Sequence, residues 1–161
     1  MRSLVILAAL LIPASTAHAR PPLCAPEVIE STLIGAGHLT QEEIDADAGV
    51  NLVRCGDVTG DGGTDVVFTV ASGGTAGDTH FGVIEGGADG AGEVALFKEG
   101  YKVGIARHDK RSFDVLQPHY GSKDANCCPS SFRRTRYTWT GTRFKAGKAK
   151  TLKKAPASFY R

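Results

Sequence analysis

Three aspartates recur at every fourth position in residues 55–65, which read CGDVTGDGGTD and contain little that is bulky. Calcium prefers carboxylate and carbonyl oxygens, and a tight loop presents alternate positions to one ion. Counted from Asp57, the alternate positions are Thr59, Asp61, Gly63 and Asp65, with Gly63 offering its backbone carbonyl. These five residues are the candidate metal ligands, and calcium is the candidate cofactor.

The same composition is also typical of an acidic turn between two strands. In such a turn the aspartate carboxylates accept hydrogen bonds from nearby backbone N–H groups. Thr59 is a weaker ligand than the Asn or Asp usual at the third position, and Phe68 stands where an EF-hand loop has its bidentate glutamate. Calcium binding and a plain acidic turn therefore both stay open at this point.

The four cysteines form the second pattern that could carry chemistry. In an exported protein an even number predicts two disulfides, for which three connectivities exist. We favour Cys24–Cys55 together with a vicinal bond between Cys127 and Cys128, and leave cross-pairing open. Closing the loop between the first two would contribute roughly 3–4 kcal/mol on the chain-entropy model, whereas a vicinal bond closes almost no loop.

Charge is separated along the chain. Residues 24–100 contain fourteen acidic against two basic residues, and residues 133–161 contain ten basic residues and no acid. Such segregation favours a cation near the acidic half and an anionic polymer near the basic third, unless both are simply solvated faces. Arg133, Arg134 and Arg136 are the candidate anion-binding residues. Aromatic residues among them could stack bases, but we expect no nucleic acid as partner of an exported protein.

The first nineteen residues have the parts of a secretory signal peptide. A basic start precedes the unbroken apolar run 4–12, and Ala17 and Ala19 supply the small-residue pattern before a cleavage site. The run is too short to cross a bilayer, which needs roughly 20 residues. We expect a secreted or extracytoplasmic protein cleaved after Ala19, without a transmembrane segment. We expect no lipid anchor on Cys24, because the bulky Leu23 precedes it.

The positioning elements follow from the apolar spacing. The stretch APEVIESTLIGAG has helical periodicity, and Thr40 with Glu43 forms a capping-box pattern before a second helical turn. From residue 50 onward, short β-rich stretches alternate with glycine-containing turns, one of them a hairpin turn at Thr140–Gly141. We predict an α+β fold, with one or two short N-terminal helices packed on a mostly antiparallel sheet of five to seven strands.

The predicted domain organisation has three parts. A signal peptide, 1–19, precedes a single β-rich domain, 20–145, and a basic C-terminal tail, 146–161. The tail is small-residue-rich and weakly patterned, which is compatible with a loose segment.

Two family resemblances rest on these motifs. The stretch CGDVTGDGGTDVVFTV, followed later by NCCPSSF and RYTWTGTRF, resembles the LppP/LprE family of exported actinobacterial proteins over roughly residues 54–144. That resemblance implies a signal sequence and a single β-rich domain at the cell envelope, and it carries no enzymatic activity onto these residues. Many members look like lipoproteins; this sequence departs there because it lacks a good lipobox, so we expect a secreted form. Residues 57–65, which run directly into a strand, also resemble one FG-GAP-type or dockerin-like calcium loop, although no second copy exists to build a propeller.

These observations predict a non-catalytic secreted or cell-envelope protein, a small binding or structural module that calcium could stabilise. Whether it is an enzyme stays open, with the non-catalytic reading favoured. No histidine stands in a recognised motif, and TVASGGTAG is not G-x-S-x-G. The alternatives are a secreted hydrolase using the aspartates with His80, His108 or His119, and a binder of an anionic cell-wall polymer through the basic C-terminal third.

Overall fold

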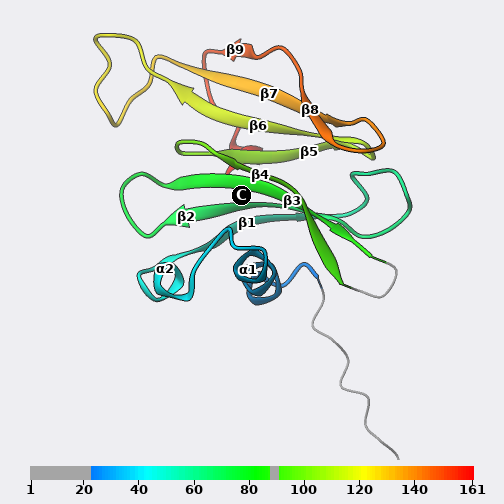
Figure 1. Cartoon of the computed structure of the whole chain (residues 1–161). Coiled ribbons are helices and arrows are strands. Elements are labelled where there is room, and N and C mark those ends of the chain that lie inside the picture. The colour runs from blue at the N-terminus through cyan, green and yellow to red at the C-terminus, as the bar shows by residue number, and fades with distance from the viewer. Residues whose placement is uncertain (1–22, 88–90) are drawn as a thin grey trace, which may run out of the picture.

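The computed structural model describes residues 23–87 and 91–161, so the predicted signal peptide lies outside the described residues. These residues form three layers, in the order helices, first sheet and second sheet (Figure 1). The helices are α1 (Pro26–Gly35) and α2 (Gln41–Asp45). Sheet A contains β1 (Ala48–Cys55), β2 (Val66–Ser72), β3 (Asp78–Gly86) and β4 (Gly92–Glu99). Sheet B contains β5 (Gly104–Asp109), β6 (Ser112–His119), β7 (Ser131–Trp139), β8 (Phe144–Ala146) and β9 (Lys150–Leu152).

Both predicted helices are present, with the expected local signals. Pro26 begins α1, where its missing N–H costs no helical hydrogen bond. Thr40 and Glu43 form the capping box: the Thr40 hydroxyl accepts from the Glu43 N–H at 3.2 Å, and Glu43 Oε2 accepts from the Thr40 N–H at 2.8 Å. Ile29 and Leu33, one turn apart on α1, are fully buried against sheet A.

The predicted single sheet of five to seven strands is wrong in number and arrangement, although the α+β class broadly fits. The described residues form nine antiparallel strands in two sheets, in the orders β1-β2-β3-β4 and β5-β6-β7-β8, with β9 on β7. The spacing of apolar residues indicates where strands form, but it does not show which strands hydrogen-bond to each other. Here β4 and β5 do not pair, and the sheet is divided between them. Strand β9 has three residues, too few for a periodic signal.

Two apolar cores hold the layers together. One lies between the sheets and includes Val67, Phe81, Phe113 and Tyr137. The other lies between sheet A and the helices and includes Phe68. Sheet A is therefore buried on both faces, which is why VVFTV in β2 is a nearly unbroken apolar run.

The basic segment 146–161 is ordered rather than loose. Strand β9 pairs with β7, and a 3-10 turn, η1 (Ala157–Phe159), packs against β5. Phe159 is 4% exposed, and the Tyr160 hydroxyl donates to the Lys102 carbonyl at 3.2 Å. The segment thus crosses from sheet B back towards sheet A (Figure 1).

Candidate functional site

The aspartate loop, residues 56–65, connects β1 to β2 at one end of sheet A. The backbone N–H of Gly56 donates to the carbonyl of Asp65 at 3.0 Å and closes the base of the loop. Gly60 and Gly62 have φ angles of 81° and 89°, in the left-handed region that glycine enters at little cost. These two glycines give the loop the tight curvature that the sequence predicted.

Asp65 is the buried anchor of this loop, with no exposed surface. Its Oδ2 accepts from the N–H groups of Val58 at 2.8 Å and Thr59 at 2.9 Å, and from the Thr59 hydroxyl at 2.9 Å. Its Oδ1 accepts from the Gly86 N–H at 3.1 Å, at the end of β3. Asp65 therefore fastens the loop both to itself and to the neighbouring hairpin.

Asp57 also accepts from backbone donors within the loop. Its two oxygens accept from the N–H groups of Gly60 at 2.6 Å and Gly62 at 3.2 Å. Asp61 Oδ1 accepts from the Gly63 N–H at 2.7 Å. These are the hydrogen bonds of an acidic turn, yet a carboxylate has about four acceptor positions. Both side chains therefore retain oxygen lone pairs that could reach an ion.

The three aspartates are brought together as predicted. One carboxylate oxygen from each of Asp57, Asp61 and Asp65 lies within 4.8 Å of the other two. Calcium holds oxygens at 2.3–2.6 Å, so two ligands of one ion are at most about 5 Å apart, and this cluster meets that limit. Thr59 is buried beside the cluster: it is 4% exposed, and its hydroxyl donates to Asp65 at 2.9 Å. The Gly63 carbonyl stays a predicted ligand.

Two further carboxylates, which the loop spacing did not reveal, lie beside the cluster. Asp61, Glu85 and Glu93 line an open depression of about 440 Å³. Glu85 and Glu93 stand directly opposite each other on β3 and β4, a placement that is unfavourable for like charges. Burial raises the pKa of Glu85, and the negative charges of Asp65, Asp61 and Glu93 raise it further. Only the register of the β3–β4 hairpin, not either strand alone, could have shown this pair.

The disulfides have the favoured connectivity. Cys24–Cys55 joins a residue two positions before α1 to the last residue of β1, so it ties the base of the aspartate loop to the helical layer. The Cys127–Cys128 bond lies in the exposed connection between β6 and β7. There Asp124 accepts from the N–H groups of two loop residues, which lower its pKa. The first disulfide links two layers, whereas the second acts within one loop.

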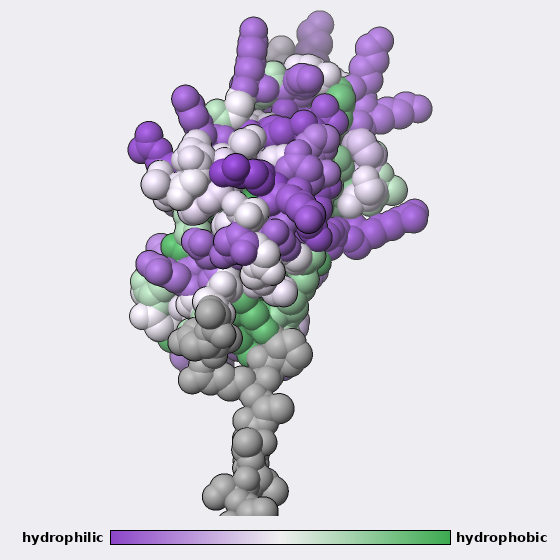
Figure 2. Space-filling model, turned by 90° about the vertical axis from the view of Figure 1, so that its right-hand side faces the viewer, coloured by the Kyte–Doolittle hydropathy of each residue, from purple (hydrophilic) through white to green (hydrophobic). Residues whose placement is uncertain are grey.

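The three candidate anion-binding arginines do not share one face of sheet B. Side chains alternate along a strand, so Arg134 and Arg136 lie on the outer face of β7 and Arg133 on the opposite face. Arg136 donates to both oxygens of the nearly buried Asp114, from Nε at 2.8 Å and from Nη2 at 3.0 Å. Figure 2 shows long hydrophilic side chains projecting from the upper part of the molecule, where sheet B lies.

Two of the three aromatic residues among these arginines, Tyr137 and Trp139, do not form an open stacking surface, while the third, Phe132, is half-buried on the outer face of β7. Tyr137 is 8% exposed and stacks on Phe113, with 5.3 Å between ring centroids. Trp139 packs on Phe144 at 4.9 Å and belongs to the core between the sheets. These two rings stabilise the fold instead of facing the basic side chains.

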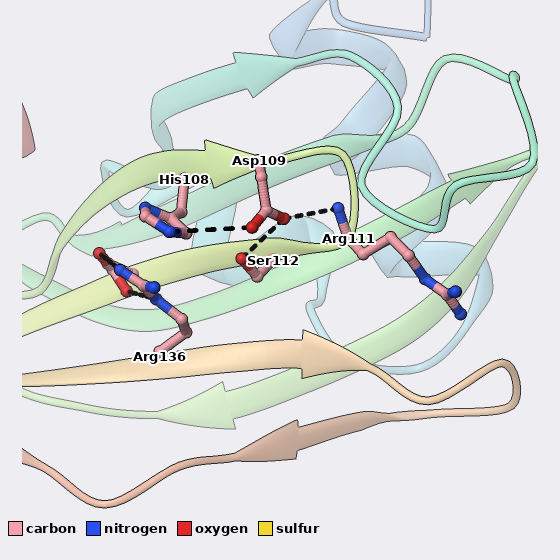
Figure 3. Close-up of polar contacts among 6 residues, drawn as sticks. His108, Asp109, Arg111, Ser112 and Arg136 are labelled. Atoms are coloured by element: carbon pink, nitrogen blue, oxygen red, sulfur yellow. Dashed lines mark hydrogen bonds and ion pairs between the residues drawn. The ribbon is translucent and has the colours of Figure 1, made fainter.

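His108, Asp109 and Ser112 have the residue types of a catalytic triad but not its order (Figure 3). Asp109 lies in the middle: its Oδ1 accepts from the Ser112 hydroxyl at 2.8 Å, and its Oδ2 is 3.7 Å from His108 Nε2. A triad needs the imidazole between the hydroxyl and the carboxylate, so that it can accept the hydroxyl proton. The backbone N–H of Arg111 and the Ser112 hydroxyl lower the pKa of Asp109, which stabilises the β5–β6 turn.

Compared with protein-family models, curated proteins and solved structures, the chain matches none of them. Membership in the LppP/LprE family and the likeness to FG-GAP loops therefore stay predictions from the sequence. Within residues 23–87 and 91–161, no helix combines the length and the apolar character needed to cross a membrane.

Proposed function

We propose that this protein is a non-catalytic, exported binding module whose aspartate loop takes up a calcium ion that stabilises the fold. The observation that supports a cation site is the convergence of Asp57, Asp61 and Asp65, with one carboxylate oxygen of each within 4.8 Å of the others. The export and the binding role rest on the sequence-based expectations given above.

The donor set fits a hard cation. All candidate side-chain ligands are carboxylates, which calcium prefers over nitrogen and sulfur ligands. Asp61 is exposed and Asp57 half-buried, so an ion can reach the cluster from solvent. Glu85 and Glu93 add negative charge from the adjoining depression, and a bound cation would offset their mutual repulsion.

A structural role suits the position of the loop better than a catalytic one. Asp65, the most central carboxylate, is saturated on one oxygen by hydrogen bonds that hold the loop in place. The His108 cluster, on another sheet, provides no activated nucleophile for a hydrolase. An ion at Asp57 and Asp61 would therefore brace the junction of β1, β2 and β3.

Thermal unfolding of the oxidised chain in calcium, magnesium or a chelator tests the cation. Extracellular calcium modules bind with Kd of about 10⁻⁴–10⁻³ M. At the weak end of that range, about 10 mM calcium stabilises the folded state by about 1.4 kcal/mol, or roughly 3–6 °C in Tm. We expect this rise with calcium and a smaller one with magnesium.

Two matched variants assign the effect to the loop. Asp61→Asn keeps an acceptor for the Gly63 N–H but loses the charge, so we expect it to remove most of the calcium-dependent rise. Asp124→Asn changes another turn aspartate that accepts backbone N–H groups but lies outside the cluster. It should keep the full rise. An unchanged Tm of the parent protein at millimolar calcium would reduce the loop to an acidic turn.

A further inference from the structure

We propose that the outer face of sheet B is a docking surface for a linear, flexible polyanion without bases, such as a phosphate- or carboxylate-bearing polymer of the cell envelope. The inference names the partner of the binding module proposed above and rests on that binding role, but not on the calcium ion. The surface, called the basic face from here on, consists of Arg134, Arg136, Lys145, Lys148 and Lys150.

Strand register places these cations on one side of the sheet. Arg134 and Lys150 are direct cross-strand partners on β7 and β9, and Lys145 on β8 is opposite Thr138, which shares the outer face with Arg134 and Arg136. All of the basic face except Lys145 lines a depression of about 260 Å³, together with Asp114 and Gly147. The side chains come from three strands and one connection, so the positive charge is spread over a broad surface and not concentrated at one point.

Most of this positive charge has no counter-charge within the described part of the chain. Asp114 pairs with Arg136, and Arg134, Lys145, Lys148 and Lys150 form no ion pair with any residue of 23–87 or 91–161. The direct opposition of Arg134 and Lys150 is unfavourable in the free protein. An anion between them would turn that repulsion into attraction, which is the charge complementarity that a polyanion supplies.

The shape and chemistry of the face favour a polymer of simple charged units over nucleic acid. Guanidinium groups bind phosphate and carboxylate through two parallel hydrogen bonds, and lysines act as point charges. Sequence-tolerant binding of single strands needs aromatic rings on which bases stack. Tyr137 and Trp139 are packed in the core between the sheets, whereas Phe132, half-buried near the start of β7, shares the outer face with Arg134 and Arg136. The face therefore offers its charge with a single half-buried ring beside it, not with a row of rings on which successive bases could stack.

The test is the salt dependence of binding to fluorescently labelled long-chain inorganic polyphosphate, followed by fluorescence anisotropy in a chelator. With four unpaired cations, and a slope of about 0.7 per cation, affinity should fall about fiftyfold between about 50 and 200 mM salt. The double variant Arg134→Gln/Lys150→Gln should bind more weakly and show a fall of only about sevenfold. Because calcium is absent, failure of this binding is distinguishable from failure of the calcium site.

The double variant Arg133→Gln/Lys98→Gln is the matched control. It removes the same charge from the opposite face of β7 and from β4, and it should retain the fiftyfold dependence. Equal loss in both double variants would overturn the proposal, because net charge and not this face would then govern binding. Absence of binding at the lowest salt would overturn it as well. So would at least tenfold tighter binding to single-stranded DNA with the same number of charges.

Discussion

The acidic region, meaning the aspartate loop with Glu85 and Glu93 beside it, and the basic face are opposite in charge. Yet each contains two like charges directly opposite each other on neighbouring strands: Glu85–Glu93 and Arg134–Lys150. They differ in how much of the charge is used internally. Each of the three loop aspartates accepts at least one backbone N–H, whereas on the basic face the described residues supply one carboxylate partner, Asp114. The loop is small and curved, so its carboxylates can surround a single ion. The basic face is broad, so its cations can contact several groups of an extended partner. The sign of a cluster sets the charge of its partner, and its shape sets the size of that partner.

The largest expected effect comes from removing the anchor of the acidic region. Asp65→Ala leaves the buried N–H groups of Val58 and Thr59 and the half-buried N–H of Gly86 without their acceptor. Since each unsatisfied group costs about 1–3 kcal/mol, we expect a loss of about 4 kcal/mol in the free energy of unfolding, measured by urea titration. Lys150→Ala on the basic face should change it by less than about 0.5 kcal/mol. Similar losses in both variants would abolish the contrast between the two regions.

The two disulfides should differ almost as much. Replacing Cys24 and Cys55 by alanine opens a loop with a sequence separation of 31, which should cost about 3–4 kcal/mol and lower Tm. Replacing Cys127 and Cys128 removes a bond between neighbours and should leave the global stability nearly unchanged, with increased hydrogen exchange confined to the β6–β7 connection. A global loss from the second replacement would show that this loop supports more of sheet B than its contacts suggest.

The smallest expected effect is the pH dependence of stability caused by Glu85, which tests the charge repulsion within the acidic region. The pKa of Glu85 is raised above 4.5, so the folded state holds this proton more tightly than the unfolded chain. As pH rises from the pKa of Glu85 in the unfolded chain to its higher pKa in the folded state, the contribution of Glu85 to stability therefore falls. Above the folded-state pKa this contribution is unfavourable. We expect metal-free Glu85→Gln to be slightly more stable than the parent at about pH 7, and not at about pH 4, in urea midpoints.

Calcium should invert that comparison, because a cation favours the charged carboxylate. With calcium present, the parent should gain more stability than Glu85→Gln at neutral pH. Glu99→Gln, which removes an exposed carboxylate at the end of β4 away from the depression, serves as the control and should show neither effect. If calcium stabilises the parent no more than it stabilises Glu85→Gln, Glu85 does not contribute to metal binding.

Local signals in the sequence predicted local structure well. The capping box at Thr40 and Glu43, helix α1 and the hairpin turn at Gly141 need only neighbouring residues, and all are present. The convergence of Asp57, Asp61 and Asp65 is equally local, because two glycines with positive φ bend a short loop. Such features follow from backbone sterics and hydrogen bonding within a few residues.

What the sequence could not show depends on pairing between distant strands. The division into two sheets, the Glu85–Glu93 pair and the assignment of Arg134 and Arg136 to the outer face all follow from strand register and packing. A shift of one residue would exchange the faces, so composition alone cannot assign them. The short strand β9 appears only because β7 offers it a partner.

The packing of residues 157–160 across the edge of β5 also determines the order in which parts of the protein can fold. Phe159 and Tyr160 cover Gly104 and reach Lys102, and a hydrogen bond joins Arg54 to Arg161 over a separation of 107 residues. A chain that emerges from its N-terminus can form the helices and sheet A early, but it leaves this edge of the sandwich open until these late residues arrive. Contacts of such long range slow folding. A partly synthesised chain would therefore present an unsealed strand edge to its surroundings until these residues arrive.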